Sequence, residues 1–429
     1  MTASTVRGPR MSFSDRMWGS DMFVVAIGPL PVPPRGELVA AVRRLAEHAD
    51  RTRLGWLPDH ESGRWRMATD IDALADASVN VLPEIAGESV DDVIVAASRR
   101  ARQGPAVSIW VSGDTVLVAA RHAVGDGHHM LRLLAAAVGT ALDGEVPASM
   151  RRPVTRHALP RALWAHFGRH PTNALRLARA VAGRRPARAA TGSVDWSDWS
   201  ASLTCRNRMS TPEARLELKA WRAQHAPGLS LAPLTIAAGE LALRRHGIVT
   251  AADPLVPFDL RRYVYPGGGD VPGNFTIGMR VHAADLGDPN AVQAELRRHV
   301  ALGRPLAVLA VATLRRTGRR PRRSGPAGRA TRANGGAWDI AYTYVGRVPY
   351  LARLWRDPTA ACFSALLPPN GPSGVSIAFS DMGQRIYVSA SFHESVIDAH
   401  QVEHVLDTLC AGPAALLEEH RLERVTRPV

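Results

Sequence analysis

Residues 115–134 read TVLVAARHAVGDGHHMLRLL, and the rest of the chain is organised around this stretch. The apolar residues 115–120 predict a strand, and residues 127–142 predict the helix that follows it. The turn between them holds His122, Asp126 and Gly127. Such a turn can place an imidazole at the mouth of a cleft, or it can be structural, with Asp126 capping the helix and Gly127 relieving crowding. We expect His122 to be catalytic and Asp126 and Gly127 to be structural.

The composition is that of a folded protein with a strongly basic balance. The 429 residues are 46% hydrophobic and 21% charged, which suffices for a sizeable core in two or three domains. The net charge of +14 is compatible with a nucleic-acid partner, but Lys219 is the only lysine and arginine supplies the other positive charges. Richness in arginine and alanine is typical of GC-rich bacterial genes, and no nucleic-acid-binding motif occurs. We therefore expect no nucleic-acid partner.

The cysteines and the apolar runs favour a cytoplasmic protein without a membrane span. Cys205, Cys362 and Cys410 are far apart and form no CxxC pair, so neither a zinc site nor a disulfide framework is supported. The apolar run at 22–27 is too short to cross a bilayer. Acidic residues precede this run, unlike the basic region that begins a secretory signal.

Strands and helices alternate in both halves of the chain, which predicts an α/β fold of two lobes, each a mixed sheet with packed helices. Residues 1–11 are expected to be a loose tail. The N-terminal lobe, with the RHAVGDG motif, is predicted at 12–185 and the C-terminal lobe at 195–429, with a linker at 183–192. A single helix is expected over 290–314.

One segment of the C-terminal half cannot contribute to a core. Residues 315–332 contain eight arginines among glycines and prolines, which predicts an Arg-rich flexible loop at 315–334. The loop is either a solvated segment or a landing site for phosphates or an acidic partner.

Motifs for other chemistries are missing or stand in the wrong context. His128 and His129 follow the turn directly, but their spacing matches no metal site and adjacent helical residues point to different sides, so we expect no metal. The glycines at 267–269 and 273 lead into a strand, without the helix N-terminus that binds phosphate. No P-loop sequence occurs, and the absence of a GxSxG elbow argues against an α/β-hydrolase.

The turn at 121–127 (RHAVGDG) resembles the HHxxxDG signature of the CoA- and carrier-dependent acyltransferase superfamily. This superfamily includes the condensation domains of nonribosomal peptide synthetases, polyketide-associated acyltransferases, wax ester synthase/diacylglycerol acyltransferases and the plant BAHD enzymes. Further similar segments follow in the expected order, namely 13–15 (FSD), 256–261 (VPFDLR), 272–275 (PGNF) and 343–347 (TYVGR). The resemblance therefore extends over nearly the whole chain.

The resemblance implies two chloramphenicol-acetyltransferase-like lobes with a tunnel between them. It also implies that His122 is the catalytic histidine and that Asp126 pairs with Arg261 in a structural role. Arg121 stands where the superfamily usually has its first histidine, and Tyr344 replaces the usual asparagine. Arg121, Asn274, Thr343 and Tyr344 are the residues expected to line the tunnel.

The function implied is that of a free-standing acyltransferase in bacterial natural-product or lipid biosynthesis. It would move an acyl group from acyl-CoA, or from the phosphopantetheine arm of an acyl carrier protein, to a small-molecule alcohol or amine, with His122 as general base. The thioester is a co-substrate, and no permanently bound cofactor is expected. The departures at Arg121 and Tyr344 keep an alternative open, namely a diverged protein that serves as a binding module or catalyses a cyclisation.

Overall fold

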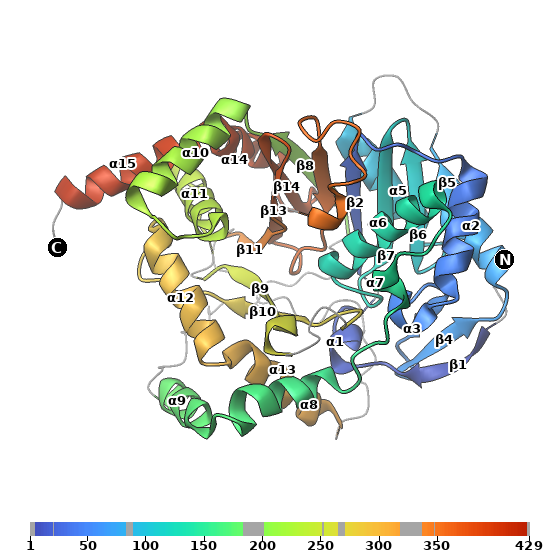
Figure 1. Ribbon diagram of the computed structural model, residues 1–429. Helices are drawn as coiled ribbons and strands as arrows, with labels where there is room; N and C mark the ends of the chain where they lie inside the picture. The colour runs from blue at the N-terminus through green and yellow to red at the C-terminus, as the bar shows by residue number, and fades with distance from the viewer. Residues whose placement is uncertain are drawn as a thin grey trace.

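The computed structural model describes residues 5–19, 21–82, 89–182, 201–250, 253–264, 271–317, 337–346 and 348–426. Two mixed sheets lie next to each other, each with helices packed on it, as expected for a two-lobed α/β fold (Figure 1). Among the described residues, no helix is long and apolar enough to cross a membrane. The linker predicted at 183–192 and all but the start of the arginine-rich loop predicted at 315–334 fall outside the described residues.

The sheet of the N-terminal lobe has five strands in the order β12-β2-β7-β6-β5. These are β2 (Met22–Gly28), β5 (Val79–Val81), β6 (Val107–Ser112), β7 (Thr115–Arg121) and β12 (Cys362–Leu366). β2 is buried along its whole length because its alternate side chains face two different layers. Phe23 and Val25 belong to one hydrophobic core, whereas Val24 and Ala26 belong to another on the opposite face. This double burial explains why the sequence of β2 is apolar at every position.

Helices cover both faces of this sheet. The core around Phe23 is closed by α2 (Arg35–Ala46), α4 (Ile71–Ser78) and α6 (Gly127–Asp143), and the opposite core by α5 (Val90–Ala101). At the rim, a small sheet of order β1-β4-β3 consists of β1 (Thr5–Arg10), β3 (Trp56–Asp59) and β4 (Arg64–Ala68). Short helices connect these elements, namely α1 (Phe13–Arg16), α3 (Ala49–Thr52) and α7 (Ala148–Arg151).

The sheet of the C-terminal lobe has six strands in the order β10-β9-β11-β13-β14-β8. They are β8 (Leu203–Met209), β9 (Leu255–Asp259), β10 (Thr276–Arg280), β11 (Asp339–Tyr344), β13 (Gly374–Met382) and β14 (Arg385–His393). Its main core includes residues of α10 (Pro212–His225), α11 (Leu231–Arg245), α14 (Ala399–Ala411) and α15 (Pro413–Thr426). The strand β9 leads directly into the 3-10 turn η2 (Leu260–Tyr263), which contains Arg261; a further 3-10 turn is η5 (Pro349–Leu351).

A further group of helices lies along the left and lower edges of Figure 1. It contains α8 (Ala158–Leu163), the π-helical turn η1 (Trp164–Gly168), α9 (Pro171–Ala182), α12 (Pro289–Ala301) and α13 (Arg304–Thr317). Ala162 of α8 is fully buried in a core with Phe258 and Leu306, so α8 packs on the C-terminal lobe. The helix expected over 290–314 is two helices, because the chain turns at Gly303 with a φ of 61°.

Three sequence expectations about the lobes require correction. Residues 5–10 form the paired strand β1 and are not a loose tail. β12, from the predicted C-terminal range, pairs with β2 at the edge of the N-terminal sheet. Because α8 lies on the opposite lobe to its predicted one, the ranges 12–185 and 195–429 do not coincide with packed units. Sequence periodicity identifies such segments as strands or helices but does not show which sheet they join.

Candidate active site

The motif turn connects β7 to α6 at the boundary between the lobes. β7 is paired on both sides, with β2 and β6, and ends at Arg121. His122 follows, and its main-chain N–H donates to the carbonyl of Asp21 at 2.7 Å. Asp126 then caps α6, because its side chain accepts the main-chain N–H of His129 at 3.1 Å. The strand–turn–helix order expected from the sequence is therefore present.

Asp126 and Arg261 form a buried ion pair between the lobes. Nη1 of Arg261 donates to Oδ2 of Asp126 at 2.9 Å, and Nη2 donates to Oδ1 at 3.3 Å. The other Arg261 donors reach the carbonyls of Val271 and Gly273 and the carboxylate of Asp259. Only 6% of the Arg261 surface is exposed, so each of these bonds replaces water that the guanidinium lost on folding.

The environment of Asp126 keeps its carboxylate charged. Burial by itself would raise the pKa of Asp126, but the Arg261 charge and the Arg261 hydrogen bonds outweigh it. Main-chain N–H groups of Phe275 and His129 also donate to the carboxylate, and together these contacts lower the pKa to about 2. The pairing expected for Asp126 is thus present, in addition to its capping role.

Asn274 fixes the main chain of the motif. Its side-chain Nδ2 donates to the carbonyls of His122 at 2.7 Å and of Ala123 at 3.0 Å, and also approaches Oδ1 of Asp15 at 3.3 Å. Asn274 is only 3% exposed. The amide of Asn274 is thus buried against the turn and holds it, and its expected place in a tunnel stays a prediction.

Arg53 completes the support of the turn from the side of the small sheet. Its Nη1 donates to Oδ1 of Asp15 at 2.7 Å and to the carbonyl of Val124 at 3.1 Å. Gly273 makes this approach possible, since a Cβ there would overlap the Arg53 guanidinium and its φ of +73° favours glycine. The carbonyls of residues 122–124 are thus all bonded to side chains from other parts of the chain.

The His122 imidazole lies against two aromatic rings. Its ring stacks on Trp18 with a centroid distance of 3.7 Å and an interplanar angle of 9°, and Phe23 meets its edge at 5.1 Å. Nδ1 is buried without a hydrogen bond among the described residues, as is Oδ1 of Asn274. Burial lowers the pKa of His122 to about 4, against smaller raising effects of its own backbone, Asp126 and the Asn274 side chain. His122 is therefore neutral at pH 7, while the residue as a whole keeps partial exposure.

The histidines after the motif do not form a metal site. His129 is buried and its Nε2 lies 3.3 Å from the carbonyl of Thr52, whereas His128 is exposed. Burial, with the nearby Arg53 charge, lowers the pKa of His129 to about 3, so it stays neutral. Within the described part of the chain, no cluster of three or more histidines, cysteines or carboxylates could hold a metal ion.

The glycine that relieves crowding in the turn is not the expected one. A Cβ added to Gly127 would meet no atom within 4 Å. A Cβ on Gly125 would overlap the ring of His129 and approach Cε of Met130 to 2.8 Å. The steric role predicted for Gly127 therefore belongs to Gly125, and Gly127 is simply the first residue of α6.

The other residues expected in the tunnel lie at the ends of two strands, β7 and β11. Arg121 is partly exposed, and its Nη2 lies 3.5 Å from the carbonyl of Arg102. Thr343 and Tyr344 are half-buried at the end of β11, paired with Ala378 and Phe379 of β13. Their place in a tunnel stays a prediction.

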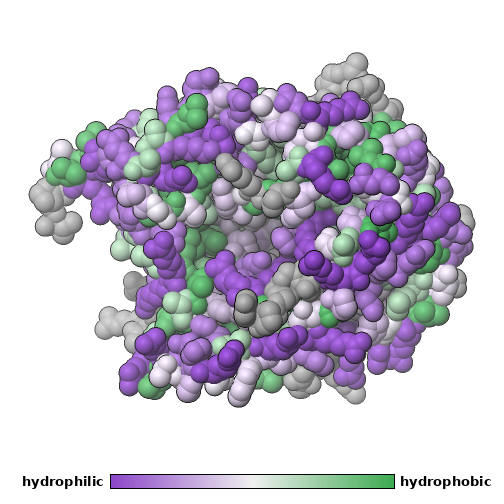
Figure 2. Space-filling model, in the orientation of Figure 1, coloured by the Kyte–Doolittle hydropathy of each residue, from purple (hydrophilic) through white to green (hydrophobic). Residues whose placement is uncertain are grey.

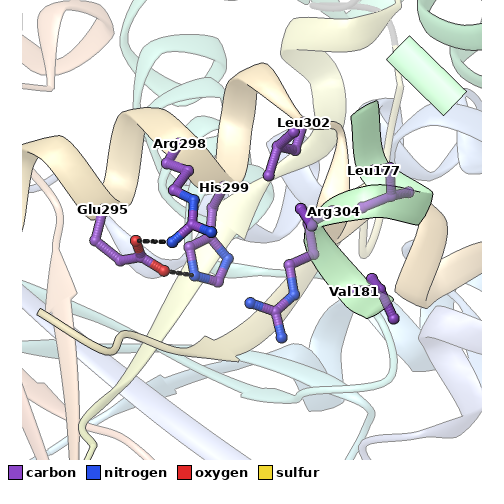
Figure 3. A pocket seen from close by; sticks show the side chains of 8 residues that line it. Leu177, Val181, Glu295, Arg298, His299, Leu302 and Arg304 are labelled. Atoms are coloured by element: carbon purple, nitrogen blue, oxygen red, sulfur yellow. Dashed lines mark hydrogen bonds and ion pairs between the residues drawn. The ribbon is translucent and has the colours of Figure 1, made fainter. Parts of the chain in front are cut away.

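Two small, open pockets lie among the described residues, and His122 lines neither of these two. One lies between α9 and α12 and is lined by the ion pair of Glu295 with His299 and by Leu177 and Val181 (Figure 3). The other lies behind the motif at the start of α6. It is lined by Arg51, His128, His129, Arg132, Met150, Arg261, Val271 and Pro272. The surface in Figure 2 is also hollowed near its centre.

Sequence reasoning missed two residues that contact the motif. Trp18 stacks on His122, but it lies in a turn far upstream, where no spacing connects it to the motif. Arg53 was likewise not selected, although its partner Asp15 belongs to the FSD segment that supported the resemblance. A single arginine or tryptophan outside a motif shows no sequence pattern that would connect it to His122.

Solved structures resemble this fold, although comparisons by sequence find no match. No protein-family profile matches the sequence, and no relative was found among curated proteins. Among solved structures, the first condensation domain of the calcium-dependent antibiotic synthetase has a TM-score of 0.61 at 15% identity, over 96% of both chains. The chain has the condensation-domain fold.

Two other structures share this condensation fold. Trichothecene 15-O-acetyltransferase from Fusarium sporotrichioides has a TM-score of 0.60 at 12% identity, over 97% of both chains. Polyketide synthase associated protein 5 from Mycobacterium tuberculosis has a TM-score of 0.56 at 16% identity, over 96% of this chain and 100% of that one. At such low identity the likeness concerns the fold, so activity has to be argued from the residues of the site.

The geometry limits what the site can do chemically. A neutral imidazole with one buried nitrogen and a rigid main chain can accept a proton at Nε2 and return it.

Proposed function

We propose that this protein is an acyltransferase that moves an acyl group from a thioester to an alcohol or amine, with His122 as the general base. One observation carries the proposal: the neutral imidazole of His122 is held on a turn whose main chain is fixed by Asn274 and by the Asp126–Arg261 pair. The condensation fold, which an O-acetyltransferase shares, supports the same reading.

The reaction needs one proton to be moved twice. Nε2 of His122 takes the proton of the acceptor hydroxyl or amine as that atom attacks the thioester carbonyl. The new C–O or C–N bond forms, the carbonyl oxygen becomes negatively charged, and the imidazolium next to it stabilises that charge. When the C–S bond breaks, the thiolate leaves with the proton from the imidazolium. A positioned histidine contributes typically ~10²–10⁴-fold to the rate of such a step.

The donor in this proposal is acyl-CoA or an acyl group on the phosphopantetheine arm of a carrier protein, and the acceptor is a small molecule. Both donors are thioesters, so the chemistry at His122 is the same for either. No resident cofactor takes part in this scheme, since both proton transfers use the imidazole alone.

The test is a transfer assay read by mass spectrometry, with a panel of acyl-CoAs and loaded carrier proteins and a mixture of alcohols and amines. His122→Ala should lose the product while its melting temperature stays close to that of the wild type. His128→Ala is the matched control, since it removes an exposed imidazole next to the motif and should stay active. Undiminished product formation by His122→Ala would refute the role of general base.

A second function has specific support and competes with the first. Arg121 occupies the place of the first motif histidine, and the pocket at the start of α6 is lined by His128 and His129 and not by His122. Both observations favour a diverged protein that binds a ligand or catalyses a cyclisation without acyl transfer. In the same assay this reading predicts no acylated product from any donor.

A further inference from the structure

Trp18 makes the closest aromatic contact of the motif histidine. Its indole is nearly parallel to the His122 imidazole, at 9°, with the ring centroids 3.7 Å apart. Phe23 approaches the same imidazole at an interplanar angle of 63°. Nδ1 of His122 is buried without a hydrogen bond among the described residues, so the packing of these rings contributes to the orientation of the side chain.

The segment that carries Trp18 is anchored to the motif on both sides of the indole. On one side, Asp15 of α1 is 1% exposed and contacts the Asn274 amide, which binds the His122 carbonyl. On the other side, the carbonyl of Asp21 accepts the main-chain N–H of His122, and the N–H of Asp21 donates to the carbonyl of Trp18. The indole is thus held at a fixed place relative to the turn.

Stacking on a face leaves the reactive edge of an imidazole open. The Nε2 lone pair lies in the ring plane, whereas Trp18 covers one of the two faces. Among the ring nitrogens of His122, only Nδ1 is a buried atom without a partner. A substrate proton can therefore reach Nε2 in the plane of the ring while the ring cannot swing toward Trp18.

We propose that Trp18 is a positioning residue for His122, whose indole fixes the plane of the imidazole and keeps water from its covered face. This inference rests on the proposed function insofar as it concerns catalysis, but the orientation itself is a property of the resting protein. Trp18 acts through His122 and has no bonding role of its own.

Nuclear magnetic resonance of the histidine side chains tests the orientation without any substrate. The His122 ring signal, assigned by its loss in His122→Gln, should lie upfield in the wild type because of the indole above it. In Trp18→Ala this displacement should vanish, and the His122 pKa should rise from about 4 toward the ordinary value near 6.5 as water reaches the ring. Trp164→Ala is the matched control, because Trp164 is 67% exposed on η1.

Two further variants separate stacking from simple space filling. Trp18→Phe keeps an aromatic face and should retain an upfield signal and a low pKa. Trp18→Leu keeps apolar bulk without a ring, so it supplies a folded comparison if Trp18→Ala is unstable. A His122 signal and titration that are the same in Trp18→Leu as in the wild type would overturn the proposal.

The catalytic part of the inference is tested by kinetics. Trp18→Leu should lower kcat on the order of tenfold with little change in KM, and Trp18→Phe should recover most of that loss. Equal kcat values for all three proteins would refute positioning. If the wild type transfers no acyl group from any donor, the proposed function fails, while the resonance measurement still decides whether Trp18 orients His122.

Discussion

Removal of the Asp126 carboxylate tests the central electrostatic contact of the site. In Asp126→Ala, Arg261 stays 6% exposed and keeps two carbonyls and the half-exposed Asp259, but it loses both bonds to its buried partner. Breaking a buried ion pair costs about 3–5 kcal/mol, and the lost helix cap costs about 1 kcal/mol. Because Asp259 compensates in part, we expect a loss of roughly 4 kcal/mol in the free energy of unfolding.

The assay is urea unfolding of Asp126→Ala, Arg261→Met and the double variant, followed by circular dichroism. If Asp126 and Arg261 stabilise the fold by pairing, the double variant should lose less free energy of unfolding than the two single variants lose together. The interaction energy should then be about 2 kcal/mol or more. A strictly additive cycle, or single variants as stable as the wild type, would refute the reasoning.

The same pair predicts a pH dependence. The pKa of Asp126 is lowered from 3.8 to about 2 in the folded protein, so its contribution is complete above pH 4 and is lost as the pH falls from about 4 to about 2. A difference of this size corresponds to about 2 kcal/mol. Protonation therefore costs less than the Asp126→Ala substitution, because a protonated carboxyl group still fills the space that alanine leaves empty. The acid unfolding curve of Asp126→Asn should therefore be flatter than that of the wild type between pH 4 and pH 2.

Three other outcomes follow from the structure. Because burial lowers the pKa of His122 to about 4, the acid limb of kcat/KM should fall near pH 4, whereas a limb near 6.5 would contradict the burial of the ring. Glu240 is 2% exposed next to Tyr342, and burial raises its pKa, so its ionisation destabilises the fold as the pH rises. Glu240→Gln should therefore raise the urea midpoint more at pH 8 than at pH 4. Gly125→Ala should cost about 1–3 kcal/mol by overpacking, while Gly127→Ala should leave thermal stability equal or slightly higher.

The sequence predicts the parts of the site that are local or that recur as short segments. The turn around His122 and the capping by Asp126 follow from neighbouring residues, and the partner Arg261 follows from the resemblance of the VPFDLR segment. What is not predictable is set by contacts between distant segments. The crowding of Gly125 depends on how His129 and Met130 pack, and this is invisible in the spacing of the motif.

The same limit applies to the fold. The apolar pattern predicts two mixed sheets because periodicity is a local property. It does not predict that β12 pairs with β2, since pairing across hundreds of residues depends on which sheet edge is free. The exchange of β12 and α8 between the lobes explains why boundaries drawn from composition differ from the packed units.

The motif turn is held by residues of both lobes and so connects them. The turn belongs to the N-terminal sheet through β7, yet Arg261 and Asn274, which hold it, follow β9 and precede β10 of the C-terminal sheet. A rotation of one lobe against the other would pull on the carbonyl of His122 through Asn274. It would also have to separate a buried ion pair, at a cost of several kcal/mol. Any movement between the lobes is therefore expected away from this joint, and the main chain of the motif turn should keep its place while the rest of the lobes adjust.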